Sequence, residues 1–349
     1  MTAATLTLRP GALTLNALRR IAEGTAVPRL DPDSRPAVDA AAAVVAEICA
    51  GTRAVYGINT GFGKLAQSRI PADRLGDLQR NLVLSHAAGV GAPLPASTVR
   101  LILALKLNAL AQGYSGVRWA VLEHLDALLA HDILPVIPAQ GSVGASGDLA
   151  PLAHMAAAML GVGEVFVDGT RQPAEAALQA AGRAPLDLAP KEGLALLNGT
   201  QVSTALALEG LFAAENVFAA AVSAGALSVE AIRASAVPFD PRLQALRGQP
   251  GQRDVAAVYA GLLDGSAILA SHRNCGKVQD PYSLRCQPQV MGACLDSLRT
   301  VAGTLLAEAN GVSDNPLIFP ETGPGARPGT GEVMSGGNFH AEPVALAAD

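Results

Sequence analysis

Three consecutive residues, Ala145, Ser146 and Gly147, can convert their own backbone into an electrophile. They lie in the run 141–152, which reads Gly-Ser-Val-Gly-Ala-Ser-Gly-Asp-Leu-Ala-Pro-Leu. Gly147 has no side chain, so its nitrogen can fold back onto the carbonyl carbon of Ala145, and the other glycines of the run permit the turn. Loss of one water closes a five-membered ring, and loss of the Ser146 hydroxyl leaves an exocyclic methylidene. The sequence therefore predicts an electron sink built without any added cofactor.

The same run has plainer interpretations. It fits a flexible turn leading into a helix, with Asp148 near the helix N-terminus and Pro151 in its first turn. It does not fit a hydrolase nucleophile elbow, because Asp148 stands where the second glycine belongs. Pyridoxal phosphate, another electron sink, would need a Schiff-base lysine. Lys64 is the lysine that follows a glycine-rich loop, and its spacing differs from that of a phosphate-binding loop.

Five sequence blocks in a fixed order carry a family resemblance. Besides 141–152, they are Tyr56–Gly63, Asn198–Thr200, Gln279–Cys286 and Gly336–His340. Together they closely resemble the aromatic amino acid and histidine ammonia-lyases, whose Ala-Ser-Gly segment forms a 4-methylidene-imidazol-5-one group autocatalytically. The resemblance covers essentially the whole chain, and the histidine-specific members are the most similar. It implies non-oxidative elimination of ammonia from L-histidine to give urocanate, the first step of histidine degradation, with no metal or nucleotide.

The resemblance implies a catalytic role for each matching residue. Tyr56 is the base that removes the carbon-bound proton, a task for which a phenol needs neighbouring positive charge or hydrogen bonds. Ala145, Ser146 and Gly147 form the prosthetic group, and Asn198 and Tyr282 hydrogen-bond that group and the departing amine. Without the family match, Tyr56 would be interpreted as an ordinary packed tyrosine.

Three further residues are candidates for binding the substrate. Arg285 carries a planar guanidinium that suits a carboxylate, and an ordinary surface arginine is the open alternative. The resemblance implies that Gln279 orients the substrate and that Phe339 packs beside the prosthetic group. Each of these residues, taken alone, is more often structural.

The choice of substrate depends on His86. Leu78, Leu82 and His86 recur every four residues, which predicts that His86 lies on the buried stripe of its helix. A hydrogen-bonded core histidine is the alternative interpretation. In the family, the pair Ser85-His86 resembles the histidine-specific form, in which His86 contacts the substrate imidazole. Phenylalanine or tyrosine ammonia-lyases and aminomutases are the nearest alternatives.

The remaining histidines do not predict a metal site. His124 and His131 are seven positions apart, whereas a metal-binding pair on a helix needs a spacing near four. We expect them on a solvated helix face.

The composition favours a protein with a large core that associates with copies of itself. Of the 349 residues, 50% are hydrophobic, 16% are charged and only 3% are aromatic, so Ala, Leu and Val must fill the core. So much apolar surface on few charges suggests that other subunits cover some helix faces. The family resemblance implies a homotetramer that binds a small amino acid. The net charge of -5, without a basic stripe, argues against a nucleic acid partner.

The cysteines and the apolar runs of the sequence indicate the cellular compartment in which we expect the protein. Four cysteines lack paired or CxxC spacing, which favours reduced thiols in the cytoplasm: Cys49, Cys275, Cys286 and Cys294. The uncharged, apolar stretch 193–208 is too short to span a bilayer, so we expect no membrane partner. Arg9 and Pro10 interrupt any apolar signal core, and we expect no secretory signal.

The periodicity predicts a mainly α protein. We expect a mostly helical N-terminal domain over residues 1–200, which carries the prosthetic-group loop, and the first part of a long-helix bundle over 201–349. The expected helices are 13–24, 36–51, 72–88, 96–113, 116–131, 149–160, 203–236, 255–263 and 288–310. A short strand opens the chain, a hairpin covers 164–171, a break covers 238–251 and a loop covers 313–337.

The last residues of the sequence begin a helix, 344–349, and stop. The family resemblance implies further helices, one of which supplies a glutamate that grips the imidazole. We therefore expect a C-terminally truncated chain whose turnover is well below that of a complete homologue. A catalytically impaired scaffold that keeps the fold is the alternative from a different functional class.

Overall fold

A computed structural model describes residues 3–61, 66, 68–273 and 275–349. The expectations for Phe62, Gly63 and Lys64 therefore lie outside the described residues. The fold is mainly α, as predicted, and the chain divides into two compact units. Unit 1 comprises Met1–Glu209 and Thr304–Asp349, and unit 2 comprises Gly210–Gly303. This division differs from the predicted one, because residues 304–349 return to the first unit instead of continuing a separate bundle.

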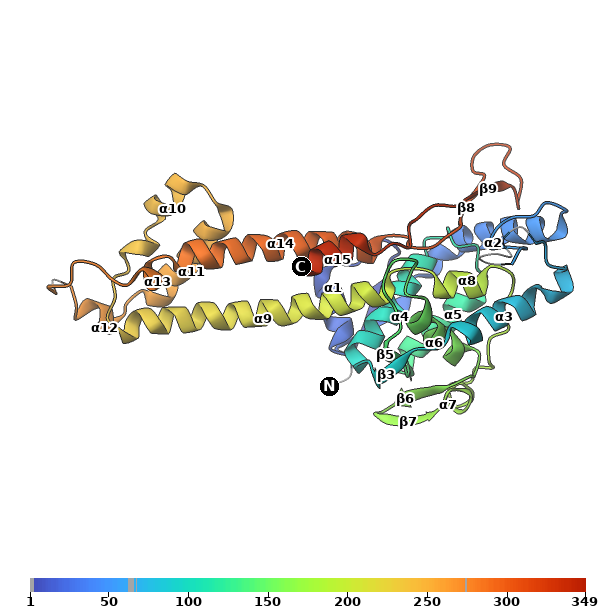
Figure 1. Cartoon of the computed structure of the whole chain (residues 1–349), viewed down its shortest axis with the longest axis horizontal. Helices are drawn as coiled ribbons and strands as arrows, with labels where there is room; N and C mark the ends of the chain where they lie inside the picture. Colours follow the sequence, from blue (N-terminus) through green and yellow to red (C-terminus); the bar gives the residue numbers. More distant parts are fainter. Residues whose placement is uncertain (1–2, 62–65, 67, 274) are drawn as a thin grey trace. The chain divides into compact units, whose positions relative to one another are not determined.

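Unit 1 is built mainly from helices (Figure 1). Its helices are α1 (Leu15–Ala22), α2 (Arg35–Ala50), α3 (Leu75–His86), α4 (Ala96–Leu110), α5 (Trp119–Ala130), α6 (Leu149–Met159), α7 (Ala174–Ala180), α8 (Glu192–Leu197) and α15 (Glu342–Ala348), with short 3-10 turns η1 (Pro32–Ser34) and η3 (Ala72–Arg74). From Leu101 to Leu110, every side chain of α4 is buried, because α1 and α5 pack against it. The short helix α8 packs against α3 and α6.

Small sheets connect these helices. One sheet is parallel and pairs β1 (Ala4–Leu8) with β2 (Ala26–Leu30). The other pairings are antiparallel: β3 (Val90–Pro93) with β5 (Pro138–Gln140), and β8 (Leu317–Pro320) with β9 (Gly331–Met334). In a three-stranded sheet, β6 (Glu164–Val167) pairs with both β4 (Leu134–Pro135) and β7 (Thr170–Pro173). The hairpin predicted at 164–171 is confirmed by β6 and β7. The loop predicted over 313–337 is wrong in part, because β8 and β9 pair within it. Pairing of β3 with β5 brings the chain that leaves α3 beside the chain that enters the run 141–148.

Unit 2 contains most of two long helices, α9 (Gln201–Ala231) and α14 (Gln287–Asn310), and several short ones. The short elements are η4 (Val237–Phe239), α10 (Pro241–Arg247), α11 (Pro250–Leu263), α12 (Ala267–Ala270) and α13 (Tyr282–Arg285). The break predicted over 238–251 is therefore wrong in part, because α10 forms there. In the core of unit 2, the rings of Phe239 and Tyr259 stack with their centroids 4.9 Å apart.

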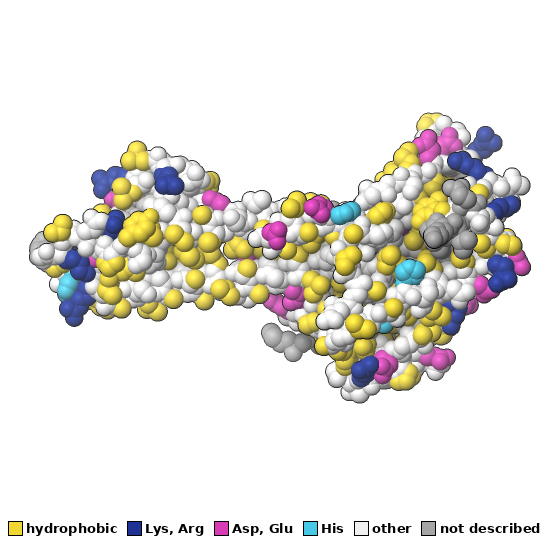
Figure 2. Space-filling view, in the orientation of Figure 1, with side chains coloured by type: hydrophobic (Ala, Val, Ile, Leu, Met, Phe, Trp, Pro, Cys, Tyr) yellow, Lys and Arg dark blue, Asp and Glu magenta, His cyan; other side chains and the backbone are white. Residues whose placement is uncertain are grey.

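Much of the second unit's surface is apolar (Figure 2). Exposed side chains there include Val217, Leu227, Leu246 and Val258. Within the described residues, the helical stretches Glu192–Ala231 and Gln287–Asn310 are long and apolar enough to cross a membrane by length and composition alone. Core helices of water-soluble proteins meet the same criterion, so this property by itself does not indicate a membrane span.

Candidate active site

The run 141–148, here called the ring-forming loop, joins β5 to α6. Its backbone folds back sharply, since Ala145 and Gly147 pair as an isolated bridge with Ser146 between them. Ser146 is exposed at the tip, and Gly147 is buried beneath it. The fold-back lies at the three residues for which the sequence predicted ring closure.

Gly147 lies too close to its neighbours for any side chain. Its φ is +83°, and a Cβ at this position would lie 2.8 Å from Asn198 Oδ1 and 2.9 Å from Gly199 N. Only glycine accepts both the left-handed backbone and this contact without strain. The side-chain amide of Asn198 therefore lies directly against Gly147, whose nitrogen the sequence analysis expects to react.

Asp148 anchors the ring-forming loop. Its carboxylate is fully buried and accepts hydrogen bonds from Ser142 Oγ at 2.7 Å, Ser203 Oγ at 2.7 Å, Ser203 N at 2.8 Å and Val202 N at 2.9 Å. The prediction that Asp148 lies at the N-terminus of the following helix α6 is confirmed, but its side chain does not cap that helix. It caps α9 instead, where two backbone N–H groups and the helix dipole favour a carboxylate.

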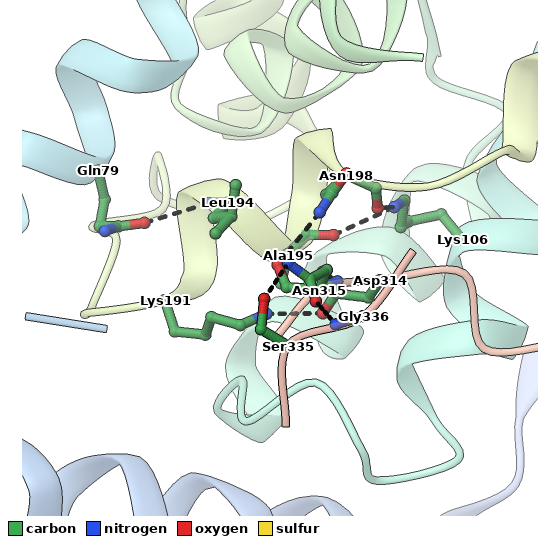
Figure 3. Close-up of polar contacts among 10 residues, drawn as sticks. All are labelled: Gln79, Lys106, Lys191, Leu194, Ala195, Asn198, Asp314, Asn315, Ser335 and Gly336. Atoms are coloured by element: carbon green, nitrogen blue, oxygen red, sulfur yellow. Dashed lines mark hydrogen bonds and ion pairs between the residues drawn. The ribbon is translucent and has the colours of Figure 1, made fainter. Parts of the chain in front are cut away.

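Asn198 is connected to two later segments of the chain (Figure 3). Its Nδ2 donates to the carbonyl of Asn315 at 3.1 Å. The side chain of Asn315 in turn donates to Ser335 Oγ at 3.1 Å and accepts from Gly336 N at 2.6 Å. These bonds hold the segments 313–316 and 335–336 against the end of α8.

Phe339 belongs to the same part of unit 1. Its side chain is half-buried, and Ala341, two residues later, donates its N–H to the Gly144 carbonyl at 3.0 Å. The segment that contains Phe339 is therefore bonded directly to the ring-forming loop.

Tyr56 lies in a turn that packs on α8. A Cβ on the next residue, Gly57, would lie 2.7 Å from Pro316 Cδ and 2.9 Å from Leu194 Cδ2, and its φ is +76°. This close packing seats the turn against α8 and the 313–316 segment, while the Tyr56 side chain is exposed.

His86 ends α3, but the stripe predicted for it is not the buried one. The buried residues of α3 are Leu75, Gln79 and Val83, whereas His86 is half-buried beside them. The spacing of four residues is correct, but the buried positions are 75, 79 and 83 instead of the predicted 78, 82 and 86. Gln79 is buried because its Oε1 accepts the Leu194 N–H of α8 at 3.1 Å. His86 Nδ1 contacts the Leu82 carbonyl at 2.9 Å, and within the described part of the chain nothing hydrogen-bonds its Nε2.

His154, on α6, connects the His86 segment to the ring-forming loop. Its Nε2 accepts the Gly89 N–H at 3.1 Å, and Gly89 lies next to Gly141, where a Cβ would come within 3.2 Å of the Gly89 Cα. A ring nitrogen that accepts a hydrogen bond must be unprotonated. Burial lowers the pKa of His154, in agreement with this contact.

The stability of the protein should therefore fall in mild acid. The pKa of His154 lies below its ordinary value of about 6.5, so between the two values the unfolded chain binds more protons than the folded chain. We expect the contribution of His154 to the free energy of unfolding to be complete above about pH 6.5 and to be lost as the pH falls through the lowered pKa. The loss should be about 1 kcal/mol, the usual contribution of one hydrogen bond. Urea unfolding between pH 5 and 8 measures it. His154→Gln should flatten this part of the profile, and identical profiles for the two chains would refute the assignment.

Gln279, Tyr282 and Arg285 form a separate group in unit 2. The Arg285 guanidinium lies over the Tyr282 ring, 5.6 Å from its centroid, and Arg285 Nε donates to the Asp280 carbonyl at 3.0 Å. When the Gln279 amide is oriented with its oxygen toward Arg285, that oxygen accepts from Nη2 at 2.5 Å. Tyr282 is 72% exposed. The three residues thus form one accessible cluster of donors.

The structure brings the predicted residues together in two sets. Unit 1 contains Ser146 and its two neighbours, Asn198, Phe339, Tyr56 and His86, and unit 2 contains the other three. Sequence reasoning missed the anchoring role of Asp148, the bridging role of Asn315 and a buried lysine, Lys106. The sequence carries a signal for this residue, because Lys106 is the one charged residue within the largely apolar run 101–110, and such a lysine is expected to be buried with specific partners.

Comparison with known proteins shows the family of the chain. Residues 13–349 match the family model for aromatic amino acid lyases, and the chain belongs to this family. Histidine ammonia-lyase of Burkholderia pseudomallei is 61% identical over 344 residues, which are 99% of this chain and 66% of that protein. The chain therefore spans 66% of the length of the curated relatives that it matches.

Solved structures show the same fold. The crystal structure of histidine ammonia-lyase from Trypanosoma cruzi superposes with a TM-score of 0.86 at 37% identity, over 98% of this chain and 63% of that one. Tyrosine aminomutase from Streptomyces globisporus gives a TM-score of 0.88 at 35% identity, over 99% of this chain and 67% of that one. Ergothionase from Treponema denticola gives 0.90 at 28% identity, over 98% and 67% of the two chains.

Proposed function

We propose that this chain carries the site of a histidine ammonia-lyase, a carbon-nitrogen lyase that eliminates ammonia from L-histidine and yields urocanate. The observation that carries the proposal is the bridge between Ala145 and Gly147, with Ser146 exposed at the tip and Asn198 against Gly147. The 61% identity to histidine ammonia-lyases supports the same substrate.

Formation of the ring and its methylidene from Ala145–Gly147 releases two waters. The Gly147 nitrogen bonds to the Ala145 carbonyl carbon, and the oxygen leaves with the amide hydrogens of Gly147 and Ser146, which creates a C=N bond. The Ser146 Cα hydrogen and hydroxyl then leave together and create the methylidene. The resulting 4-methylidene-imidazol-5-one would supply an electrophilic carbon that withdraws electrons during the elimination. The site fits this group, because the backbone already folds back at Ser146 and residue 147 has no room for a side chain.

The chain's own residues then bind and deprotonate the substrate. Tyr56 takes the carbon-bound proton, and Asn198 hydrogen-bonds the prosthetic group and the departing amine. The family resemblance supports the same role for Tyr282, which belongs to unit 2. Arg285 pairs with the substrate carboxylate through its planar guanidinium, and Gln279 orients it. Phe339 packs beside Ser146 and keeps water away.

His86 selects histidine. Its Nδ1 is engaged by the Leu82 carbonyl, which fixes the ring and leaves Nε2 for the substrate imidazole. A fixed ring recognises a polar substrate at a smaller entropic cost than a mobile one.

We infer that copies of the chain assemble as a homotetramer that covers the exposed apolar side chains of unit 2. All four cysteines are free, which supports a reducing compartment, the cytoplasm.

Ultraviolet absorbance of the unsaturated acid formed from each substrate, which is urocanate from histidine and cinnamate or 4-hydroxycinnamate from phenylalanine or tyrosine, tests the proposed function. We expect histidine to be the preferred substrate and His86→Phe to raise its KM about tenfold, since a lost buried hydrogen bond costs about 1–3 kcal/mol. His131→Phe, at an exposed position, serves as the control and should match the unsubstituted chain. Faster turnover of phenylalanine or tyrosine would overturn the substrate assignment.

A further inference from the structure

Lys106 is a buried cation whose role the proposed chemistry does not explain. It lies in α4, is 1% exposed and is flanked in the sequence by Leu105 and Leu107. An unpaired buried charge is costly, so its position must be compensated by specific contacts. Those contacts are two backbone carbonyls, of Ala195 at 3.1 Å and of Asn198 at 2.9 Å (Figure 3).

The two carbonyls belong to the end of α8. The last carbonyls of a helix have no partner within it, and a cation there is favoured by the helix dipole. Asn198 is the residue at which the backbone leaves the helical conformation, with φ -87° and ψ 128°. Lys106 therefore fixes the point where α8 stops and the direction in which Asn198 leaves it.

The direction matters because Asn198 and its neighbour meet the ring-forming loop. Asn198 Oδ1 lies against Gly147, and the Gly199 carbonyl accepts the Asp148 N–H at 2.8 Å. A displaced α8 end would move both contacts together.

We propose that Lys106 is a positioning residue for ring closure, which holds the end of α8 so that Asn198 and Gly199 clamp the Gly147–Asp148 backbone in its folded-back form. This inference rests on the proposed function and deepens it. Burial lowers the pKa of Lys106 to about 7, with Lys191 acting in the same direction and Asp314 and Asp148 opposing it. A neutral amine still has two N–H groups for the two carbonyls, so the clamp persists in either protonation state.

The test measures how fast the chain loses the mass of two waters. The full chain and its variants are synthesised in a cell-free system, and intact masses are recorded over time. We expect Lys106→Met to lengthen the half-time at least about tenfold, because small misplacements of reacting groups cost large factors in rate. Arg100→Met is the matched control: Arg100 lies on the same helix and pairs with Asp132 at 2.7 Å, away from the loop, and should change the half-time less than about threefold.

A double-mutant cycle separates positioning from a general structural role. If Lys106 acts through Asn198, Lys106→Met should slow ring closure much less in an Asn198→Ala background than in the unsubstituted chain. A purely structural lysine would lower the yield of soluble protein but leave the half-time of the soluble fraction unchanged. If Lys106→Met gives no soluble chain, Lys106→Gln replaces it with the same expectation, because the shorter side chain cannot bring its N–H groups to both carbonyls.

The possible failures are distinguishable. Equal half-times for the unsubstituted chain and the Lys106 variant would overturn this inference alone. An unsubstituted chain that never loses mass would overturn the proposed function and this inference together.

Discussion

A Ser146→Ala chain should never show the loss of two waters, because it has no hydroxyl to eliminate, whereas the unsubstituted chain should weigh about 36 Da less than its translated sequence. Without the serine hydroxyl no methylidene can form, so the elimination loses its electron sink. We expect urocanate formation to fall by more than about 10³-fold, equivalent to over 4 kcal/mol of transition-state stabilisation. Intact-mass spectrometry and urocanate absorbance measure the two effects on one sample.

The fold should survive this change, because Ser146 is exposed and the loop is anchored by Asp148. Far-ultraviolet circular dichroism should therefore be unaltered. Ser223→Ala, at an exposed position on α9, is the control and should retain the mass deficit. A full translated mass in the unsubstituted chain would refute the prediction.

Lys191→Met should destabilise the protein by about 3–5 kcal/mol, the usual cost of removing one partner of a buried ion pair. Lys191 Nζ lies 2.7 Å from Asp314 Oδ2, and the side chains are 0% and 3% exposed. The substitution leaves the carboxylate buried without its cation. Urea unfolding of the folded chain gives the change in free energy.

Replacing both partners should restore most of this loss. In Lys191→Met/Asp314→Leu no unpaired charge remains, and such replacements are often neutral. The exposed pair Arg74–Asp77 provides a contrast, because Arg74→Met should cost less than about 0.5 kcal/mol. Additive effects of the two substitutions at the buried pair would contradict the proposed coupling.

Local patterns in the sequence predicted most helices within a few residues. The expected helices 96–113 and 288–310 correspond to α4 and α14, because an apolar stripe and its end signals lie within each segment. The missed helix α10 begins at Pro241, capped by the Asp240 side chain, so a proline interpreted as a break was a helix start. The β8–β9 hairpin was missed because glycine and proline residues dominate the composition of the segment that contains it.

The chemistry of the site was predictable only where it lies within one motif. Ala145–Gly147 carry their geometry locally, through glycine. The contact of Asn198 with Asn315 joins residues 117 positions apart, and no periodicity specifies such a partner. The buried face of α3 was predicted one residue away from the observed face, because no sequence pattern indicates the partner of Gln79. Gln79 is buried because its side chain hydrogen-bonds α8, although it is not hydrophobic.

The return of residues 304–349 to unit 1 sets an order for events during protein synthesis. The ring-forming loop leaves the ribosome long before Asn315 and Ala341, which hold Asn198 and Gly144 in place. Contacts between such distant parts of a chain form late, after loop-closure entropy has been overcome. Under the proposed ring closure, a growing chain would therefore carry Ala145–Gly147 as ordinary peptide, and the electrophile would form only after residues 304–349 have joined unit 1.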